Sequence, residues 1–319
     1  MPPFPERGHT SGMFTERPFP VTSPFTLARP PMGLARVGLA CLALAGCGSD
    51  APAAAGAMGL DHVTFDTVAT VGVMDGDDRE VFGAIWEVAS GPGGVFAVLD
   101  RQTPRISIFD AAGDFVGEVA GQGAGPGELA RPYALTWTSD GELLALDPAN
   151  ARISAFRVED GEVEHTFSQR TEVWGTGNFC ALYGRILVAA HRDDHVIHEL
   201  DEAGGIARSI SSAPVPPEAE GLEGALRAIA MEDLTAVRLH CEPERGRILE
   251  VGIMNPRIQL LEAGGTPVWT TELDEIFPLV PEVVNGGGVG MRVDPETGAH
   301  LARSIVPWDR EHVLILERR

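Results

Sequence analysis

Residues 191–198, HRDDHVIH, form the densest group of metal-ligating side chains in the chain. Imidazole and carboxylate groups bind divalent metal ions in proteins, so His191, Asp193 and His195 are candidate metal ligands. However, His195 and His198 are an odd number of residues apart, and on a strand they would point to opposite faces. The spacing therefore favours a polar hairpin end over a metal site.

A second acidic group, formed by Asp75, Asp77 and Asp78, resembles part of a calcium loop. It lacks the downstream glutamate and the regular alternate spacing of such a loop, which favours a solvated turn. The chain also has no contiguous motif of a serine hydrolase, a zinc protease, a phosphate loop or a dinucleotide site. We therefore assign no catalytic residue and expect no cofactor, with a divalent cation such as calcium as the alternative.

The elements that would position these side chains are repeated pairs of strands. In each copy a glycine is followed by a short apolar run, and a basic or imidazole residue eleven positions later opens a second run. Such a repeat, without helical periodicity between the copies, is typical of a β-propeller. We predict an all-β propeller of four-stranded antiparallel blades, with five blades countable and six as the alternative. The copies begin at Gly94, Gly141, Gly184, Gly246 and, more weakly, Gly298.

The second copy shows one predicted blade most clearly. The pair Asp140-Gly141 is a strong hairpin signal between strands expected at 133–138 and 142–146. Strands expected at 152–157 and 162–168 complete the blade.

The run GQGAGPGELARP at 121–132, with the residues that follow it, resembles an NHL repeat, the unit of six-bladed bacterial propellers. In that family the aspartate and arginine of the repeat are structural. Their five-residue spacing across a hairpin connection agrees, because a charge-assisted pair could close the turn. In the third copy Ala190 and His195 replace the aspartate and the arginine. The predicted structural residues are Gly94, Asp100, Arg105, Gly141, Asp147, Asn150, Arg152, Gly184, Gly246, Asn255 and Arg257.

Cys180 and Cys241 precede the glycines of the third and fourth copies and occupy near-equivalent places on adjacent blades. Export would allow a disulfide between them. The inner strands of adjacent blades could also hold the two Cα atoms farther apart than a disulfide permits, which would leave two buried thiols. The sequence leaves both alternatives open.

The ends of the propeller and one interval between copies carry further signals. The segment His62–Val73 alternates enough to be a strand, and we expect it to close the final blade from the N-terminal side. Residues 211–233 form an insertion in which Glu218–Met231 is expected to be a short helix, with Leu222, Leu226 and Ile229 on one face. We expect this insertion to be a packed loop or a cover over the central channel.

Residues 32–47, MGLARVGLACLALAGC, have the pattern of an export signal, because the apolar run is too short for a permanent membrane span. The last four residues resemble the lipobox of bacterial lipoproteins, which implies that Cys47 is lipidated and becomes the mature N-terminus. We predict a disordered N-terminus with signal peptide over 1–46, a flexible tether over 47–60 and the propeller over 61–319.

The formal net charge is −22, from 46 acidic and 24 basic residues. A surface this acidic repels nucleic acids and anionic lipids, so we expect membrane contact through the anchor alone. The predicted function is a non-catalytic, lipid-anchored scaffold in the bacterial cell envelope, in the periplasm or at the outer membrane. Its partner would be a ligand, protein, peptide or carbohydrate. The alternative is a metal-dependent propeller hydrolase, lactonase or lyase with its site in the axial channel.

Overall fold

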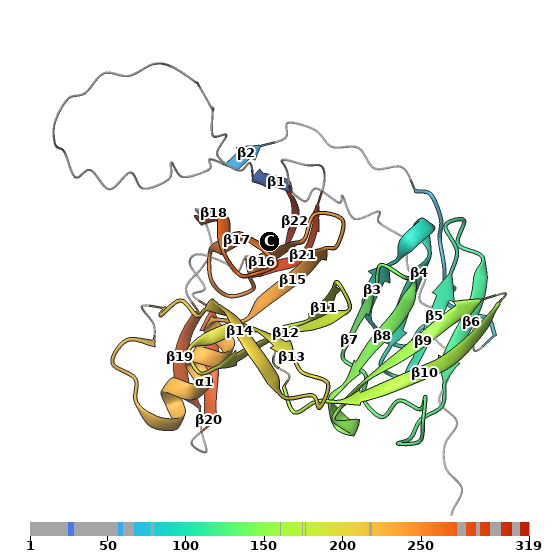
Figure 1. Cartoon of the computed structure of the whole chain (residues 1–319), viewed down its shortest axis with the longest axis horizontal. Coiled ribbons are helices and arrows are strands. Elements are labelled where there is room, and N and C mark those ends of the chain that lie inside the picture. Colours follow the sequence, from blue (N-terminus) through green and yellow to red (C-terminus); the bar gives the residue numbers. More distant parts are fainter. Residues whose placement is uncertain are drawn as a thin grey trace, which may run out of the picture.

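The computed structural model describes residues 67–77, 80–159, 161–173, 175, 177–216 and 219–272, and the backbone of six strands outside these ranges. Four sheets follow one another along the chain, each made of four consecutive antiparallel strands. The first strands of successive sheets lie side by side toward the middle of the molecule, and β6, β10 and β18 lie toward its periphery (Figure 1). The fold is a β-propeller, as predicted.

The four blades have the following strands. Blade 1 comprises β3 (Ile85–Ser90), β4 (Phe96–Asp100), β5 (Arg105–Phe109) and β6 (Phe115–Ala120); blade 2 comprises β7 (Ala134–Trp137), β8 (Glu142–Asp147), β9 (Arg152–Glu159) and β10 (Glu162–Arg170). Blade 3 comprises β11 (Phe179–Leu182), β12 (Arg185–Arg192), β13 (His195–Leu200) and β14 (Ile206–Ser212); blade 4 comprises β15 (Val237–Glu242), β16 (Arg247–Gly252), β17 (Arg257–Glu262) and β18 (Pro267–Glu272). Two 3-10 turns, η1 (Pro92–Gly94) and η2 (Pro148–Asn150), connect strands of blades 1 and 2.

The predicted count of five or six blades is wrong, because the described part of the chain forms four. After blade 4, β19 (Leu279–Val284) and β20 (Gly288–Val293) form a two-stranded sheet that no other described strand joins. The strands of the fifth copy, β21 (Leu301–Pro307) and β22 (Val313–Arg318), do form a hairpin, but they share a sheet with two strands from far earlier in the chain. The repeat pattern identifies a pair of strands, but it does not show which further strands join that pair in a sheet.

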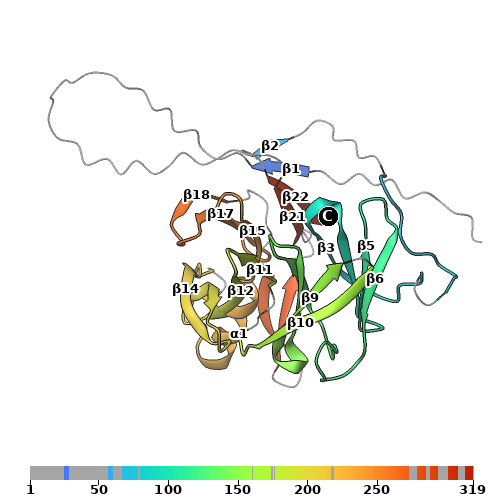
Figure 2. The same cartoon turned by 45° about the vertical axis from the view of Figure 1, so that its right-hand side comes forward.

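The strand that joins the last hairpin is not the predicted one. Residues 67–73 are irregular, and 62–66 lie outside the described residues. Instead β1 (Phe25–Ala28) pairs with β22, and β2 (Ala57–Gly59) pairs with β1, as both views show (Figure 1 and Figure 2). These two strands lie within the segments assigned above to the N-terminus and to the tether, a division that stays a prediction.

The repeated glycine lies at the turn between the first and second strands of its blade. Gly141, for example, has φ +85°, in the left-handed region that strongly favours glycine, and the glycines of the other three blades are also left-handed. The apolar runs on either side then form the two strands of the hairpin. Their buried side chains pack between neighbouring blades, as Leu144 and Leu146 of blade 2 pack with Phe179 and Val188 of blade 3.

The insertion contains the predicted helix, α1 (Gly224–Leu234), but with a different buried face. Ala230, Met231 and Leu234 are buried, whereas Ile229 is exposed. The three buried side chains pack with Leu222 and with Met254 of the loop between β16 and β17. The helix is therefore a packed element beside blades 3 and 4. No helix in the described residues is long and apolar enough to span a bilayer.

Candidate functional site

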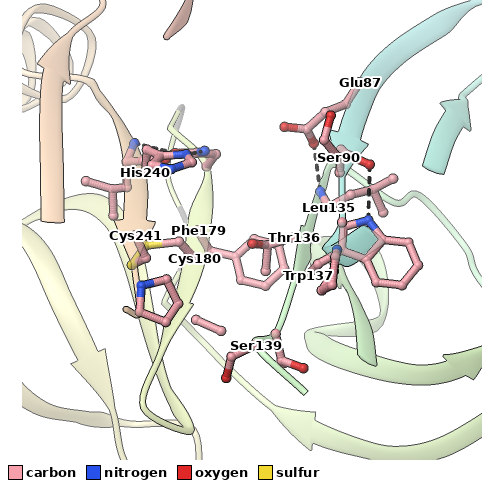
Figure 3. A pocket seen from close by; sticks show the side chains of 18 of the residues that line it. Glu87, Ser90, Leu135, Thr136, Trp137, Ser139, Phe179, Cys180, His240 and Cys241 are labelled. Atoms are coloured by element: carbon pink, nitrogen blue, oxygen red, sulfur yellow. Dashed lines mark hydrogen bonds between the residues drawn. A yellow bond between two sulfur atoms is a disulfide. The ribbon is translucent and has the colours of Figure 1, made fainter. Parts of the chain in front are cut away.

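A cavity of about 530 Å³ lies where the first strands of the four blades meet. Side chains of β3, β7, β11 and β15 form its walls, and the turns at Pro92, Ser139 and Glu244 form one end. Figure 3 shows Glu87 and Trp137 on one side, Cys180, Cys241 and His240 on the other, and the ring of Phe179 between them. Ligand sites in proteins commonly have this size, so we call this space the axial cavity and take it as the candidate site.

The strand register identifies one position that recurs in all four first strands. In each blade, the residue four positions after the repeat glycine pairs with a residue of the first strand. The recurring position is the residue immediately before that pairing partner. Along a strand this position and the one two residues later face the same side, toward the following blade. The four residues are Glu87, Ala134, Asn178 and Arg238.

Two of these side chains join their blade to the next one. A first strand is the edge of its sheet, so its outer N–H and C=O groups have no partner within that sheet. Glu87 Oε2 accepts a hydrogen bond of 2.7 Å from the Leu135 N–H of blade 2. Asn178 binds Leu239 of blade 4 twice, accepting from its N–H at 2.7 Å and donating to its carbonyl at 3.0 Å.

Glu87 is also the most strongly perturbed acid of the cavity. Burial raises its pKa to about 7, against the opposing effects of the Leu135 N–H and of the positive charge on Arg238. Near neutral pH this carboxyl group therefore exists in both the protonated and the ionised form. Protonated, it can donate a hydrogen bond; ionised, it only accepts them.

Arg238 and His240 occupy the same face of β15 and line the cavity. The Arg238 Nε is buried without a hydrogen-bond partner, and within the described residues its guanidinium forms no hydrogen bond. Burial lowers the pKa of His240, although the charge of Glu242 opposes that shift, so the neutral imidazole is favoured. The described wall of the axial cavity therefore contains the cation of Arg238, whose donors no described residue accepts.

A disulfide joins Cys180 of β11 to Cys241 of β15 in the wall of the cavity, with their Cα atoms 5.8 Å apart. From the sequence, either this disulfide or two buried thiols was possible. The structure contains the disulfide. Cys180 lies at the position equivalent to His240, so Cys241 is offset from it by one residue. An offset of one residue reverses the face of a strand, so the two side chains point toward each other.

We call the contact between the first strands of two neighbouring blades a joint. At the joint between blades 1 and 2, the indole of Trp137 takes the place that the disulfide has at the joint between blades 3 and 4. Trp137 corresponds to Cys241 in register, and its Nε1 donates to the Ala89 carbonyl at 3.0 Å (Figure 3). Trp137, Leu135 and Phe179 contribute to the apolar wall. The cavity thus combines an apolar surface with a few convergent polar groups, as ligand sites do.

The aspartates of the repeat bind backbone N–H groups of the segment that precedes their blade. Asp147 is fully buried and accepts from the N–H groups of Ala130 at 2.7 Å and Arg131 at 2.9 Å, and from the Asn150 side chain at 2.9 Å. Asp100 accepts in the same way from Gly83 and Ala84 at 2.8 and 3.0 Å. Burial raises the pKa of Asp100, but the backbone N–H bonds outweigh that effect and the net shift is downward.

The arginines bind the same segments through carbonyl groups, and the predicted ion pair is present in blade 1 but not in blade 2. Arg152 donates to the carbonyls of Ala124, Gly125 and Glu128 at 3.1, 2.6 and 2.6 Å, within the glycine-rich run. Asp147 and Arg152 therefore bind the incoming loop and do not pair with each other. In blade 1 Arg105 both donates to the Val81 carbonyl and lies 3.8 Å from Asp100.

Blade 4 replaces this arrangement with different partners. Gly252 stands where the aspartate would be, and Arg257 pairs instead with the buried Glu250 at 2.6 Å. Arg257 also donates to the Ser212 carbonyl at 2.9 Å. The Asn255 side chain donates to the Leu234 carbonyl at 3.0 Å, which attaches the end of α1 to the blade.

The histidine cluster of blade 3 is not assembled as a metal centre. His191 bonds with Thr235 at 3.0 Å, His195 bonds with the carbonyl of Asp193 in its own turn at 2.8 Å, and the buried His198 bonds with the Ala190 carbonyl. His195 and His198 differ in burial, as expected of opposite faces. Among the described residues no group of three His, Cys, Asp or Glu side chains could hold a metal ion.

Glu87, Arg238 and His240 were not predicted from the sequence. Glu87 lies seven residues before Gly94, Asn178 six before Gly184 and Arg238 eight before Gly246, because the turns between the first two strands differ in length. Alignment on the glycines therefore does not align the first strands. An antiparallel register counted outward from the turn of each hairpin would have been the available signal.

Comparison with known proteins shows no matching family model and no matching curated protein. Among solved structures the chain is similar to a putative exported protein from Bacteroides fragilis, with a TM-score of 0.47, 13% identity and coverage of 66% of this chain and 57% of that one. The β-propeller domain of Cps50 (Swd1) from Myceliophteria thermophila gives 0.38, 13%, 64% and 60%. Virginiamycin B lyase from Staphylococcus aureus gives 0.35, 12%, 65% and 69%.

Proposed function

We propose that this chain is a lipid-anchored, extracytoplasmic β-propeller that binds a small ligand in the axial cavity without changing it chemically. The observation that carries the proposal is the cavity itself, with its apolar wall and the polar groups of Glu87, Arg238 and His240. A pocket with a few polar groups directed into it is the usual form of a small-molecule site. The four blades that line it would keep this site open before a ligand arrives.

The location in the cell envelope rests on the leader. Leu44-Ala45-Gly46-Cys47 after a short apolar run resembles a lipobox, and lipid on Cys47 would hold the protein at a membrane. Residues 48–59, rich in alanine and glycine, would then separate the propeller from the bilayer. The disulfide between Cys180 and Cys241 supports an oxidising compartment.

An NHL-type organisation of the blades is part of this proposal. The run at 121–132 and the residues Asp147 and Arg152 support it, because both side chains bind the segment before their blade. The metal-dependent enzyme has no comparable observation in its favour among the described residues.

Blocking the cavity tests the proposed function. Ser90 is an exposed cavity-lining residue at the end of β3, so Ser90→Trp should fill the space with little effect on folding. We expect the wild-type full chain to give saturable fluorescence with N-phenyl-1-naphthylamine or 1-anilinonaphthalene-8-sulfonate, and the variant to lose it.

The matched control is Ser212→Trp, an exposed serine at the end of β14 that does not line the cavity. It should bind both dyes as the wild type does. The proposed function would be rejected if neither dye gave a saturable signal that depends on Ser90.

A further inference from the structure

We propose that the axial cavity selects a small monocarboxylate with an apolar body, whose carboxylate group is bound by the guanidinium of Arg238. This inference rests on the proposed function, because it names the chemistry of the ligand that the cavity would take. It concerns a single interaction, between one side chain of β15 and one functional group of the ligand.

The first step of the argument is the unused hydrogen-bonding capacity of Arg238. At the equivalent position, Glu87 and Asn178 each bind the backbone of the following blade. Arg238 makes no such bond in the described part of the chain, and its buried Nε has no partner. A guanidinium whose donors lack acceptors leaves hydrogen-bonding free energy unused, so an acceptor that enters the cavity and reaches the guanidinium would be bound favourably.

The second step is geometric. A guanidinium group presents its N–H donors in a planar fork, which matches the two oxygens of a carboxylate. Arg238 belongs to the cavity wall, so a carboxylate within the cavity could reach this fork. A neutral amide offers a single oxygen and no charge, and it would be the weaker partner.

The third step is the balance of charge, which favours a monoanion. Four titratable side chains line the cavity, namely Glu87, Arg238, His240 and, at the turn that forms one end, Glu244. Burial favours the neutral form of His240, so Arg238 is the one full positive charge among them. A phosphate dianion would bring two negative charges to one cation beside Glu87, and burying the excess charge would be costly.

Glu87 can favour the same ligand. Burial raises its pKa to about 7, and in the protonated form it can donate a hydrogen bond instead of repelling an anion. The apolar wall of Leu135, Trp137 and Phe179 then accommodates the body of the ligand. The volume of about 530 Å³ is sufficient for an aromatic or short aliphatic acid.

The inference is tested by calorimetric titration of the full chain with acids and their neutral amides. The probes are benzoate, phenylacetate and hexanoate, the corresponding amides, and phenyl phosphate as the dianion. We expect at least one acid to bind the wild type about 10- to 100-fold more tightly than its amide, and more tightly than phenyl phosphate. Arg238→Gln should remove this preference.

Two further variants separate the role of the guanidinium from effects on folding. Arg238→Lys keeps the charge without the planar fork, and it should retain part of the preference. Arg170→Gln removes an exposed arginine from the outer strand β10, and it should bind as the wild type does. Both should unfold at the same urea concentration as Arg238→Gln within error, which excludes loss of the fold as the cause.

The outcomes distinguish this inference from the proposed function. Equal binding of acids and amides, tighter binding of phenyl phosphate, no binding of any acid, or an unchanged preference in Arg238→Gln would each overturn the monocarboxylate inference. The cavity would still be a ligand site if dye binding remained sensitive to Ser90→Trp. Loss of the dye result would overturn the proposed function itself.

Discussion

Single residues attach blades 1 and 2 to the chain segments that enter them. Asp147 and Arg152 bind the same loop. The carboxylate of Asp147 accepts hydrogen bonds from its N–H groups, and the guanidinium of Arg152 donates to its carbonyl groups. A loop rich in glycine forms few bonds of its own, so these two side chains satisfy buried backbone groups that would otherwise lack partners. The spacing of the pair thus reflects a common target, the incoming loop.

Replacing Asp147 by alanine should therefore destabilise the propeller strongly. Asp147→Ala would leave the N–H groups of Ala130 and Arg131 without their acceptor, at a cost of roughly 2–4 kcal/mol in the free energy of unfolding. Urea denaturation measures the change. Asp114→Ala, which removes an exposed carboxylate that makes no side-chain hydrogen bond or ion pair with the described residues, should change stability by less than about 0.5 kcal/mol. Similar losses in the two variants would contradict the assigned role.

Glu87 should make stability depend on pH in a predictable direction. Its pKa is about 7 in the folded protein, compared with an ordinary value of 4.5, so between these values the folded state binds more protons than the unfolded chain. The contribution of Glu87 to stability therefore falls as the pH rises from 4.5 through 7. The charge of Arg238 and the neutral His240 face the same space.

The measurement compares urea midpoints at pH 5 and pH 8. Between these two values the wild type should lose more stability than Glu87→Gln, which keeps an oxygen acceptor for the Leu135 N–H but does not titrate. Glu202→Gln, at an exposed turn, should follow the wild type. Identical pH dependence of the wild type and Glu87→Gln would show that Glu87 is not perturbed in this way.

At the scale of elements, the first strand of each blade is an edge whose outer polar groups face a neighbouring blade. Side chains from the preceding blade satisfy these groups at two joints, through Glu87 and Asn178. The joint between blades 3 and 4 also has the covalent link between β11 and β15. The inner strands are therefore held by side-chain contacts, because among the described strands no backbone ladder joins one of these blades to the next.

Removing the disulfide should lower stability at this joint. The bridge closes a segment with a sequence separation of 61 residues, and cross-links of this kind contribute on the order of 2–4 kcal/mol, mainly by restricting the unfolded chain. Reductant should lower the urea midpoint of the wild type accordingly. The double variant Cys180→Ser with Cys241→Ser should show the lower midpoint without reductant and no further response to it. An unchanged midpoint of the reduced wild type would refute this contribution.

The whole molecule combines a propeller with a leader whose cysteine is predicted to carry lipid. Cleavage before Cys47 would remove β1, which pairs with β22 from Phe25↔Leu316 to Ala28↔Val313. The mature form would then contain the hairpin of β21 and β22 without that partner. The proposed anchor thus has a structural consequence for the sheet that contains the C-terminal strands.

Lipidation can be tested in a bacterial host supplied with an alkyne-tagged palmitate. The full chain should incorporate the tag and partition with membranes, and Cys47→Ser should abolish both. Cys41→Ser, in the apolar run of the same leader, is the matched control and should be labelled normally. Labelling that persists in Cys47→Ser would refute the proposed anchor.

The sequence by itself determined the class of fold, because its signals are local. A glycine in a left-handed turn between two apolar runs specifies a hairpin whatever surrounds it, as at Gly141. The helix of the insertion could be predicted for the same reason, although its buried face could not, since that face depends on Met254 and other distant partners.

Only the tertiary structure decided the number of blades, the pairing of the cysteines and the composition of the axial cavity. Glu87, Asn178 and Arg238 come from strands separated by unequal intervals, and turns of different length conceal their equivalence in the sequence. A shift of one residue reverses the face of a strand, which turns Cys241 toward Cys180. Which strand joins β22 likewise depends on the packing of the ring and not on any local pattern.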